Sequence, residues 1–358
     1  MFDPAPIFGH PAFSLGKAEK AELFATALSE LTRQHYAQCP QYKKILDVMG
    51  FDVAATHALY DIPFVPVRLF KEYELLSVAR EQIVKTMTSS GTSGQRVSKI
   101  FLDKVTAANQ TKALVKITAH LIGPKRLPML IIDSRSTLKD RSLFSARGAG
   151  ILGFSMLGRD VTYALDKEMR LDEAAVTAFI EKHHGEQLLL FGFTFMIWEH
   201  FYKTLAARGK RLALDNGVML HGGGWKKLAQ LAVDNAAFKR GIEEVSGIRR
   251  VYNYYGMVEQ TGSIFLECEH GRLHCSNFSD IIVRRHTDFA PCPPHEPGLI
   301  QLLSLLPSSY PGHSLLSEDI GELIGEDDCP CGRLGKTFAI QGRVKDAEMR
   351  GCSDTYAA

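Results

Sequence analysis

Short apolar segments alternate with longer amphipathic segments up to Tyr254, and this alternation constrains the fold more than any other feature. The strand-like runs are 127–133, 187–191, 217–221 and 249–254, and the helical segments are 103–121, 171–183, 194–207 and 225–238. Strands separated by helices of about ten to fifteen residues are typical of layered α/β folds with a largely parallel sheet. We therefore expect an α/β protein.

The pattern changes at both ends of this region. Residues 17–38 repeat apolar side chains at helical spacing, and two prolines, Pro63 and Pro66, exclude a central strand or helix interior around them. After Gly262, β-rich runs separated by Pro and Gly occur without helices, which predicts an antiparallel or barrel-like subdomain. The expected organisation is an α/β region at 1–262, a β-rich subdomain at 263–335 and a tail at 336–358.

Composition excludes several classes of protein. The 358 residues contain 42 Lys and Arg against 40 Asp and Glu, a net charge of +2, so a polybasic nucleic-acid binder is not expected. The longest apolar run, 188–198, is too short to cross a bilayer, and the N-terminus lacks a basic leader before an apolar stretch. We expect a cytoplasmic protein without membrane insertion. In that compartment, the seven cysteines indicate a metal site or a reactive thiol before disulfides.

The segment TSSGTSGQRVSK at 88–99 carries the sharpest local signal. Its two glycines let backbone amides point inward, and its hydroxyl groups and Lys99 complete a set of donors suited to a polyphosphate. The spacing of a Walker loop is absent. A polar turn between two elements remains the alternative interpretation of this segment.

Together with three later segments, this loop resembles the acyl-adenylate-forming ligases, the superfamily of acyl-CoA synthetases and luciferase. The segments occur in the order that the superfamily requires. They are NYYGMVE at 253–259, preceded by Gly222-Gly223-Gly224, then SEDIG at 317–321 and GRVKD at 342–346. The resemblance implies the N-terminal-type ligase domain, with ATP and Mg²⁺ as cofactors and a carboxylic acid as substrate.

The resemblance also assigns roles to individual residues. The β- and γ-phosphates fall to Ser89, Ser90, Gly91, Thr92, Ser93, Gly94 and Lys99, and the adenine ring to Gly222, Gly223, Gly224 and Tyr255. It implies that Glu259 holds Mg²⁺, that Asp319 binds the ribose and that Arg343 belongs to the nucleotide site, with Thr92 and Glu259 also serving catalysis. Strand-end aromatic residues and solvated acids are the structural alternatives for Tyr255, Glu259 and Asp319.

The C-terminal segment selects a branch of the superfamily. Most members continue beyond the hinge into a small domain with a catalytic lysine, whereas this sequence ends seven residues after Gly351, so that domain is expected to be absent or reduced to a short tail. Residues 342–353 resemble the tail of the LuxE-type acyl-protein synthetases, and the segment PFVPVRLFK at 63–71 resembles both these proteins and phenylacetate-CoA ligases. The resemblance implies a fatty acid substrate, transfer of the acyl group to Cys352 and an acyl reductase or other acceptor protein as partner. Lys345 occupies the hinge position and is a second candidate catalytic residue.

A second constellation gathers cysteine and histidine. Cys268 and His274, with Cys329 and Cys331 on a later turn, offer three thiolates and one imidazole, a complete tetrahedral set for structural zinc. His270 and Cys275 are competing ligands, and reduced cysteines without a metal are the alternative. Similar sets occur in relatives of phenylacetate-CoA ligase.

Three alternatives stay open at the level of sequence. The adenylate can pass to an external thiol, that of coenzyme A or of a carrier protein, or the chain can be a binding protein that retains the fold without turnover. The segment GAGILG at 148–153 matches the GxGxxG pattern, but no clean strand precedes it, so we do not expect a nicotinamide cofactor. The apolar stretches 147–157 and 191–195 are candidates for an acyl tunnel or for ordinary core packing.

Overall fold

The computed structural model describes residues 2–89, 96–138, 146–225 and 232–344, which form two compact units. The first unit comprises residues 2–89, 96–120 and 256–344, and the second comprises residues 121–138, 146–225 and 232–255. Both units combine stretches that are distant in the sequence. The expected segments 1–262, 263–335 and 336–358 are consecutive in the sequence, whereas these two units are defined by spatial contacts. That division of the sequence stays a prediction.

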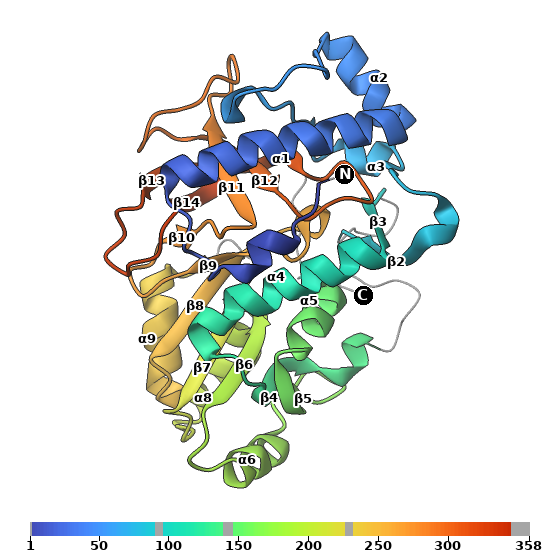
Figure 1. Ribbon diagram of the computed structural model, residues 1–358. Helices are drawn as coiled ribbons and strands as arrows, with labels where there is room; N and C mark the ends of the chain where they lie inside the picture. Colours follow the sequence, from blue (N-terminus) through green and yellow to red (C-terminus); the bar gives the residue numbers. More distant parts are fainter. Residues whose placement is uncertain (1, 90–95, 139–145, 226–231, 345–358) are drawn as a thin grey trace. The chain divides into compact units, whose positions relative to one another are not determined.

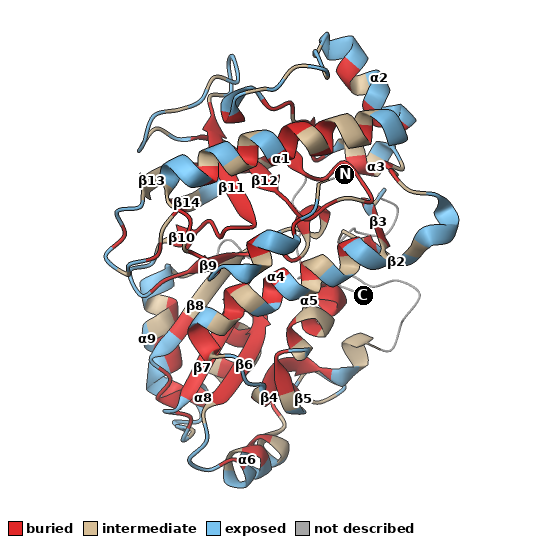
Figure 2. Cartoon of the chain, viewed as in Figure 1, coloured by how far each residue is buried: buried red, intermediate tan, exposed pale blue. Residues whose placement is uncertain are grey.

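The second unit is built on a parallel sheet with the strand order β8-β7-β6-β4-β5 (Figure 1). Its strands are β4 (Leu127–Ser134), β5 (Gly158–Leu165), β6 (Leu188–Phe193), β7 (Gly217–Gly222) and β8 (Arg250–Tyr255). Every residue of β6 and β7 is buried, as Figure 2 shows for these strands. Continuous apolar runs of this kind are typical of parallel strands that are covered on both faces. The predicted α/β class with a largely parallel sheet is confirmed.

Helices connect these strands. They are α5 (Ala146–Ser155), α6 (Glu173–Lys182), α7 (Thr194–Met196), α8 (Lys203–Ala207) and α9 (Asn235–Ser246), with a π-helical turn at Ile197–Tyr202 between α7 and α8. Of the helix expected at 225–238, residues 226–231 lie outside the described residues, and α9 begins at Asn235, where the Asp234 side chain accepts a hydrogen bond from the Ala237 amide. The GxGxxG match at 148–153 lies inside α5 and is not the strand-to-helix turn of a dinucleotide site.

The first unit contains an antiparallel sheet with the order β11-β12-β13-β14-β10-β9. Its strands are β9 (Phe265–Glu267), β10 (Leu273–His274), β11 (Ser279–Arg284), β12 (Gly298–Ser304), β13 (Ser314–Glu326) and β14 (Lys336–Arg343). The short strand β1 (Val65–Pro66) pairs in parallel with β13, and β2 (Ile83–Thr88) forms a hairpin with β3 (Lys99–Asp103). Within the described residues 263–344 there is no helix, which confirms the predicted antiparallel β-rich region.

The helices of the first unit are α1 (Lys17–Gln38), α2 (Pro40–Met49), α3 (Leu69–Glu72) and α4 (Lys104–Ile122), the last extending two residues beyond the unit. In Figure 1, α1 crosses one face of the antiparallel sheet. Hydrogen bonds hold it there, since Thr32 bonds to His313 and the Gln34 side chain donates to the Ser308 carbonyl. The helix is therefore anchored by polar contacts as well as by its buried apolar face.

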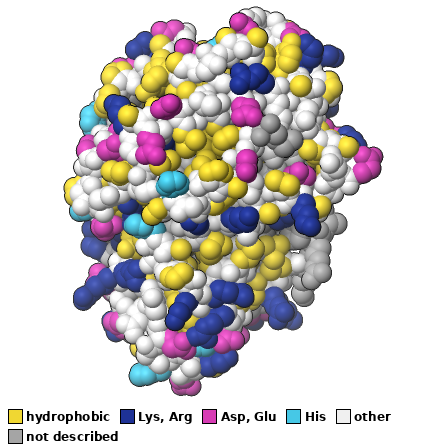
Figure 3. All heavy atoms as spheres, viewed as in Figure 1, with side chains coloured by type: hydrophobic (Ala, Val, Ile, Leu, Met, Phe, Trp, Pro, Cys, Tyr) yellow, Lys and Arg dark blue, Asp and Glu magenta, His cyan; other side chains and the backbone are white. Residues whose placement is uncertain are grey.

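None of the helices in the described part of the chain is both long enough and apolar enough to cross a membrane. On the face drawn in Figure 3, basic and acidic side chains both occur among apolar ones. This mixture is consistent with the small net charge of +2.

Two histidines lie in the core of the first unit and constrain its pH dependence. His35 donates from Nε2 to the Pro307 carbonyl (3.3 Å) and bonds through Nδ1 to the Ser77 hydroxyl (2.8 Å). Its ring stacks on that of His313 at 4.9 Å, and His313 bonds to Thr32. Burial lowers the pKa of His35 from 6.5 to about 3 and also lowers the pKa of His313. Both rings are therefore neutral in the folded protein.

Because the pKa of His35 is lowered by folding, the unfolded chain binds the proton more tightly, and stability is lost as pH falls below about 6.5. Each histidine kept neutral costs about 2 kcal/mol of stability at pH 5. In chemical denaturation at pH 7.5 and 5.0, the loss of unfolding free energy between the two pH values should be about 2 kcal/mol smaller in His35→Gln than in the wild type. Equal losses in both proteins would contradict this assignment.

Candidate active site and metal centre

The predicted phosphate loop joins the two strands of the β2–β3 hairpin. Thr88 pairs with Lys99 across the hairpin, the Ser89 amide donates to the Ser98 carbonyl (3.1 Å), and the Ser98 amide donates to the Ser89 hydroxyl (2.9 Å). These bonds fix both ends of the loop. The predicted phosphate ligands Ser90, Gly91, Thr92, Ser93 and Gly94 lie outside the described residues.

The ammonium group of Lys99 lies 3.2 Å from a carboxylate oxygen of Glu74, which also pairs with Arg80. These side chains are exposed at the start of β3, beside the described end of the loop. The hydrogen bond from Arg80, followed by that from Lys99, lowers the pKa of Glu74. The carboxylate of Glu74 therefore balances a pair of cations next to the loop.

Glu259 lies in a short 3₁₀ turn, Val258–Gln260, and only 6% of its surface is exposed. Burial raises the pKa of its carboxyl group, while the Ser98 hydroxyl and the cations Lys71 and Arg343 act in the opposite direction. The hydroxyl of Tyr310 donates to the Glu259 carbonyl (2.8 Å) and fixes the turn. A divalent cation bound to this carboxyl group would offset the cost of burying its charge, so Glu259 is a candidate ligand of Mg²⁺.

Asp319 and Arg343 face each other across β13 and β14, where they are register partners. Arg343 donates from Nε to a carboxylate oxygen of Asp319 (2.7 Å), and Asp319 is mostly buried. The charge of Arg343 also acts on the carboxyl group of Glu259. Two acids that are 60 positions apart in the sequence, Glu259 and Asp319, therefore lie in one electrostatic environment within the first unit.

In the second unit, the glycine segment and the tyrosine pair end two adjacent strands. Gly222 and Tyr254 are register partners at the carboxyl ends of β7 and β8, and Tyr255 is the last residue of β8. A Cβ atom on Gly222 would lie 2.5 Å from the Tyr254 ring, and Gly223 has a φ of +79° that favours glycine. The close packing of this aromatic ring thus requires glycine, and Gly224 follows in the same segment.

The apolar stretches proposed for an acyl tunnel pack on one another in the second unit. Phe154 stacks on Phe191 with a centroid distance of 4.3 Å and lies 4.8 Å from the ring of Tyr254. Phe154 and Phe191 are buried. These contacts form an apolar aromatic layer on the sheet. Such a layer is compatible both with an acyl tunnel and with ordinary core packing.

Sequence reasoning missed a buried ion pair in the second unit. Arg147 donates from Nε and Nη2 to the two carboxylate oxygens of Asp133, at 2.7 and 2.6 Å, and Thr137 donates to the same carboxylate. Asp133 follows the apolar residues of β4 at the carboxyl end of the strand. That position alone was a signal, because functional side chains in open α/β sheets gather at the carboxyl ends of strands.

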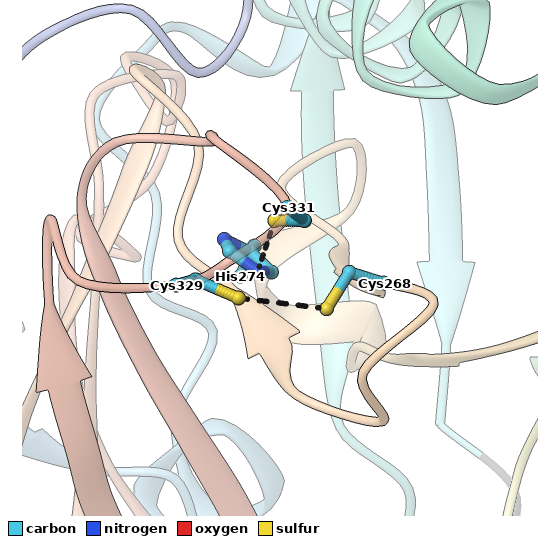
Figure 4. Close-up of side chains that lie close together, drawn as sticks. All are labelled: Cys268, His274, Cys329 and Cys331. Atoms are coloured by element: carbon cyan, nitrogen blue, oxygen red, sulfur yellow. Dashed lines mark hydrogen bonds between the residues drawn. The ribbon is translucent and has the colours of Figure 1, made fainter.

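Four predicted metal ligands converge in the first unit (Figure 4). Cys268 follows β9, His274 ends β10, and Cys329 and Cys331 lie on the turn between β13 and β14. Their potential ligand atoms all lie within 4.8 Å of one another. The β9–β10 hairpin and the β13–β14 turn, more than fifty residues apart, therefore meet at this cluster.

The spacing within the cluster fits zinc. Tetrahedral zinc with bonds of about 2.3 Å to sulfur and about 2.0 Å to nitrogen places two sulfurs about 3.8 Å apart, and sulfur and nitrogen about 3.5 Å apart. The sulfurs of Cys268 and Cys329 are separated by 3.8 Å, and the Cys331 sulfur lies 3.4 Å from Nε2 of His274. Burial raises the pKa of Cys331 to about 12 and lowers that of His274 to about 3. A metal would therefore displace thiol protons on binding.

The competing ligands take other positions in the structure. Cys275 lies in a buried environment with Asp280, Lys20 and Lys336, and burial raises the pKa of its thiol. The backbone amide of His270 donates to the Cys268 sulfur at 3.4 Å. Among the described residues, neither side chain belongs to the group of four.

The fold defines the class of the protein. Across 92% of this chain and 71% of the other, it matches the crystal structure of an open conformation of 2-hydroxyisobutyryl-CoA ligase in complex with 2-HIB-AMP and CoA, with a TM-score of 0.73 and 17% identity. A long-chain-fatty-acid-CoA ligase from Archaeoglobus fulgidus matches 76% of this chain and 54% of its own, with a TM-score of 0.51 and 14% identity. The architecture is that of the adenylate-forming ligases.

The chain belongs to the LuxE acyl-protein synthetase family, whose model matches residues 4–358. A curated relative, the long-chain-fatty-acid–luciferin-component ligase of Vibrio harveyi, is 22% identical over 352 residues, which cover 94% of this chain and 87% of the relative. The protein is an AMP-forming acyl ligase that activates a carboxylic acid as its acyl-adenylate and transfers the acyl group to a thiol. The predicted superfamily and branch are confirmed.

If the cluster of Cys268, His274, Cys329 and Cys331 binds zinc, removing one thiolate should release the metal. We expect about one zinc ion per chain in the wild type and in Cys292→Ser, and little or none in Cys329→Ser. Cys292 is a matched control because it is partly exposed and lies outside the cluster. Elemental analysis of the purified proteins measures the ratio, and equal zinc contents in Cys329→Ser and the wild type would exclude this site.

Proposed function

We propose that this enzyme uses ATP and Mg²⁺ to activate a fatty acid and then carries the acyl group on its own Cys352. The observation that carries the adenylation half is that the charge of Arg343, which bonds to Asp319, also acts on the buried carboxyl group of Glu259. Membership of the acyl-protein synthetase family supports a protein as acyl acceptor, and the Vibrio harveyi relative, a long-chain-fatty-acid–luciferin-component ligase, supports a fatty acid substrate. Cys352 and Lys345 lie outside the described residues.

The nucleotide roles are proposed unit by unit. In the first unit, the loop 89–94 and Lys99 take the β- and γ-phosphates, Glu259 takes Mg²⁺, and Asp319 with Arg343 takes the ribose. In the second unit, the segment 222–224 and Tyr255 contact the adenine. Support comes from the hairpin that fixes the ends of the loop, the buried acid and the strand-end glycines.

The proposed reaction has two displacement steps. A carboxylate oxygen of the fatty acid attacks the α-phosphorus of ATP and forms the mixed anhydride, while pyrophosphate leaves. The thiolate of Cys352 then attacks the acyl carbonyl and forms a thioester, while AMP leaves. Bound Mg²⁺ neutralises phosphate charge.

In the first step, side chains of this protein would bind and orient the charged groups of the nucleotide. Burial disfavours the charged form of Glu259, so binding of a cation there is coupled to loss of its proton. Lys99 and Arg343 already have acidic partners in Glu74 and Asp319, so neither cation is left without compensation before the nucleotide binds. Exchange of Glu74 for phosphate oxygens at Lys99, with Asp319 and Arg343 both kept beside the ribose, would orient the nucleotide.

We further propose that Cys268, His274, Cys329 and Cys331 bind structural zinc. Four protein ligands close the coordination shell, so this centre ties the β9–β10 hairpin to the β13–β14 turn and takes no direct part in the chemistry. The acyl group of Cys352 passes in this proposal to an acyl reductase or another acceptor protein. A cytoplasmic location agrees with a reduced thiol cluster.

The self-acylation step has a direct test at Cys352. Incubation with ATP and a labelled fatty acid should give a hydroxylamine-sensitive adduct on the C-terminal peptide of the wild type and of Cys292→Ser, and none on Cys352→Ser. Acid-dependent exchange of pyrophosphate into ATP should persist in all three proteins, because adenylation precedes thioester formation. Mass spectrometry locates the adduct, and equal labelling of Cys352→Ser and the wild type would assign the acyl group to another thiol.

A further inference from the structure

Arg333 is a buried cation beside the metal cluster that the proposed function does not use. It follows the sequence Cys329-Pro-Cys-Gly, and only 5% of its surface is exposed. Gly332 has a φ of +78°, and its amide donates to the Cys329 carbonyl (3.0 Å), which closes the turn before Arg333. The local backbone therefore returns the arginine to the cluster.

The guanidinium group of Arg333 has donors without acceptors. Its Nε and Nη1 atoms are buried and have no hydrogen-bond partner among the described residues. The Nη2 atom lies 3.6 Å from a carboxylate oxygen of Glu269, whose side chain is about half exposed. Unpaired N–H groups of a buried cation are costly, so such groups in a folded protein usually have an acceptor, a metal-bound ligand included.

Several contacts direct Arg333 toward the metal ligands. Its charge lowers the pKa of His274 and of Cys331, after the larger effects of burial. The Phe13 ring lies 5.6 Å from Cζ of Arg333 and packs edge-on against the His274 ring. Phe13 therefore contacts both the guanidinium group and the cluster residue His274.

The charge of the cluster calls for a cation at this position. Three thiolates and one neutral imidazole around a divalent ion have a net charge of −1. Lys336, another buried cation of this unit, is already paired, since its ammonium lies 3.2 Å from Asp280 and donates to the Ile281 carbonyl. Among the lysines and arginines in the described part of the chain, Arg333 is the one with buried, unpartnered nitrogens.

We propose that Arg333 is a positioning residue of the metal centre: its charge compensates the excess negative charge of the cysteine thiolates, and its Nε–H and Nη1–H, which have no acceptor among the described residues, donate to the thiolates once the thiol protons are lost. This inference rests on the zinc site proposed above. A planar fork with several donors suits this role better than the single ammonium of lysine. Partners of metal ligands raise metal affinity about 10- to 100-fold when they are present.

The test compares zinc affinity in three variants by competition with a chromophoric chelator. Arg333→Gln removes the charge, and Arg333→Lys keeps the charge without the fork. Arg272→Gln is the matched control, since Arg272 also acts on His274 but pairs with Asp328 (3.3 Å) and is 28% exposed. We expect zinc affinity to fall about 10- to 100-fold in Arg333→Gln, less in Arg333→Lys and less than about threefold in Arg272→Gln.

Cobalt gives a second readout that a purely structural role would not change. In the Co²⁺-substituted proteins, the sulfur-to-cobalt charge-transfer bands should shift in Arg333→Gln and stay in place in Arg272→Gln, because only the former loses donors to the thiolates. Unchanged zinc affinity and unchanged bands in Arg333→Gln would overturn the role of Arg333. Absence of zinc binding by the wild type would overturn both this inference and the zinc site, while acid-dependent pyrophosphate exchange would show separately whether adenylation stands.

Discussion

The desolvation of the Glu259 carboxyl group is the interaction on which the rest of the first unit depends. A buried acid favours its neutral form, and burial raises the pKa of Glu259 although the charges of Lys71 and Arg343 act in the opposite direction. Arg343 is held in turn by Asp319 across β13 and β14. The pairing of two strands thus places a metal-binding candidate and a ribose-binding candidate around one guanidinium group.

The β-rich part of the first unit is where the four candidate metal ligands meet. Its strands β9 and β10 are only three and two residues long, so they form few backbone hydrogen bonds. The cluster of three thiols and His274 joins these segments, and Phe13 packs against the same ring from the N-terminus. A bound metal at this position would connect the N-terminal segment, the hairpin and the long β13–β14 pair.

The alternation of apolar and amphipathic segments predicted most of the second unit, because parallel strands buried on both faces have continuous apolar sequences. The strand β5 is not among the expected strands, since its middle residues 159–163 are exposed or half-buried and include the charged Arg159 and Asp160. The strand β13 spans Ser314–Glu326, and its serines Ser314 and Ser317 are buried. The strand β14 lies in the segment 336–358 that we expect to be a tail, and its last two residues, Gly342 and Arg343, belong to the hinge-like segment.

Sequence motifs identify candidate site residues that lie within short recognisable segments, as for Glu259 and Asp319. They did not identify Arg333, Tyr310 or the pair of Asp133 and Arg147. The roles of these residues depend on which donors lack acceptors and which charges meet after folding, and residue spacing does not contain that information. The metal cluster was predictable because cysteine and histidine have few other reasons to gather.

The most direct test of the central role of Glu259 is acid-dependent exchange of labelled pyrophosphate into ATP. The wild type and Glu81→Gln, a change at an exposed position, should exchange at similar rates when a fatty acid is present. Glu259→Gln should exchange at least about 100-fold more slowly, because the Mg²⁺ that neutralises the phosphate charge would lose its protein ligand. Exchange by Glu259→Gln at the wild-type rate, or no acid-dependent exchange by the wild type, would contradict the account.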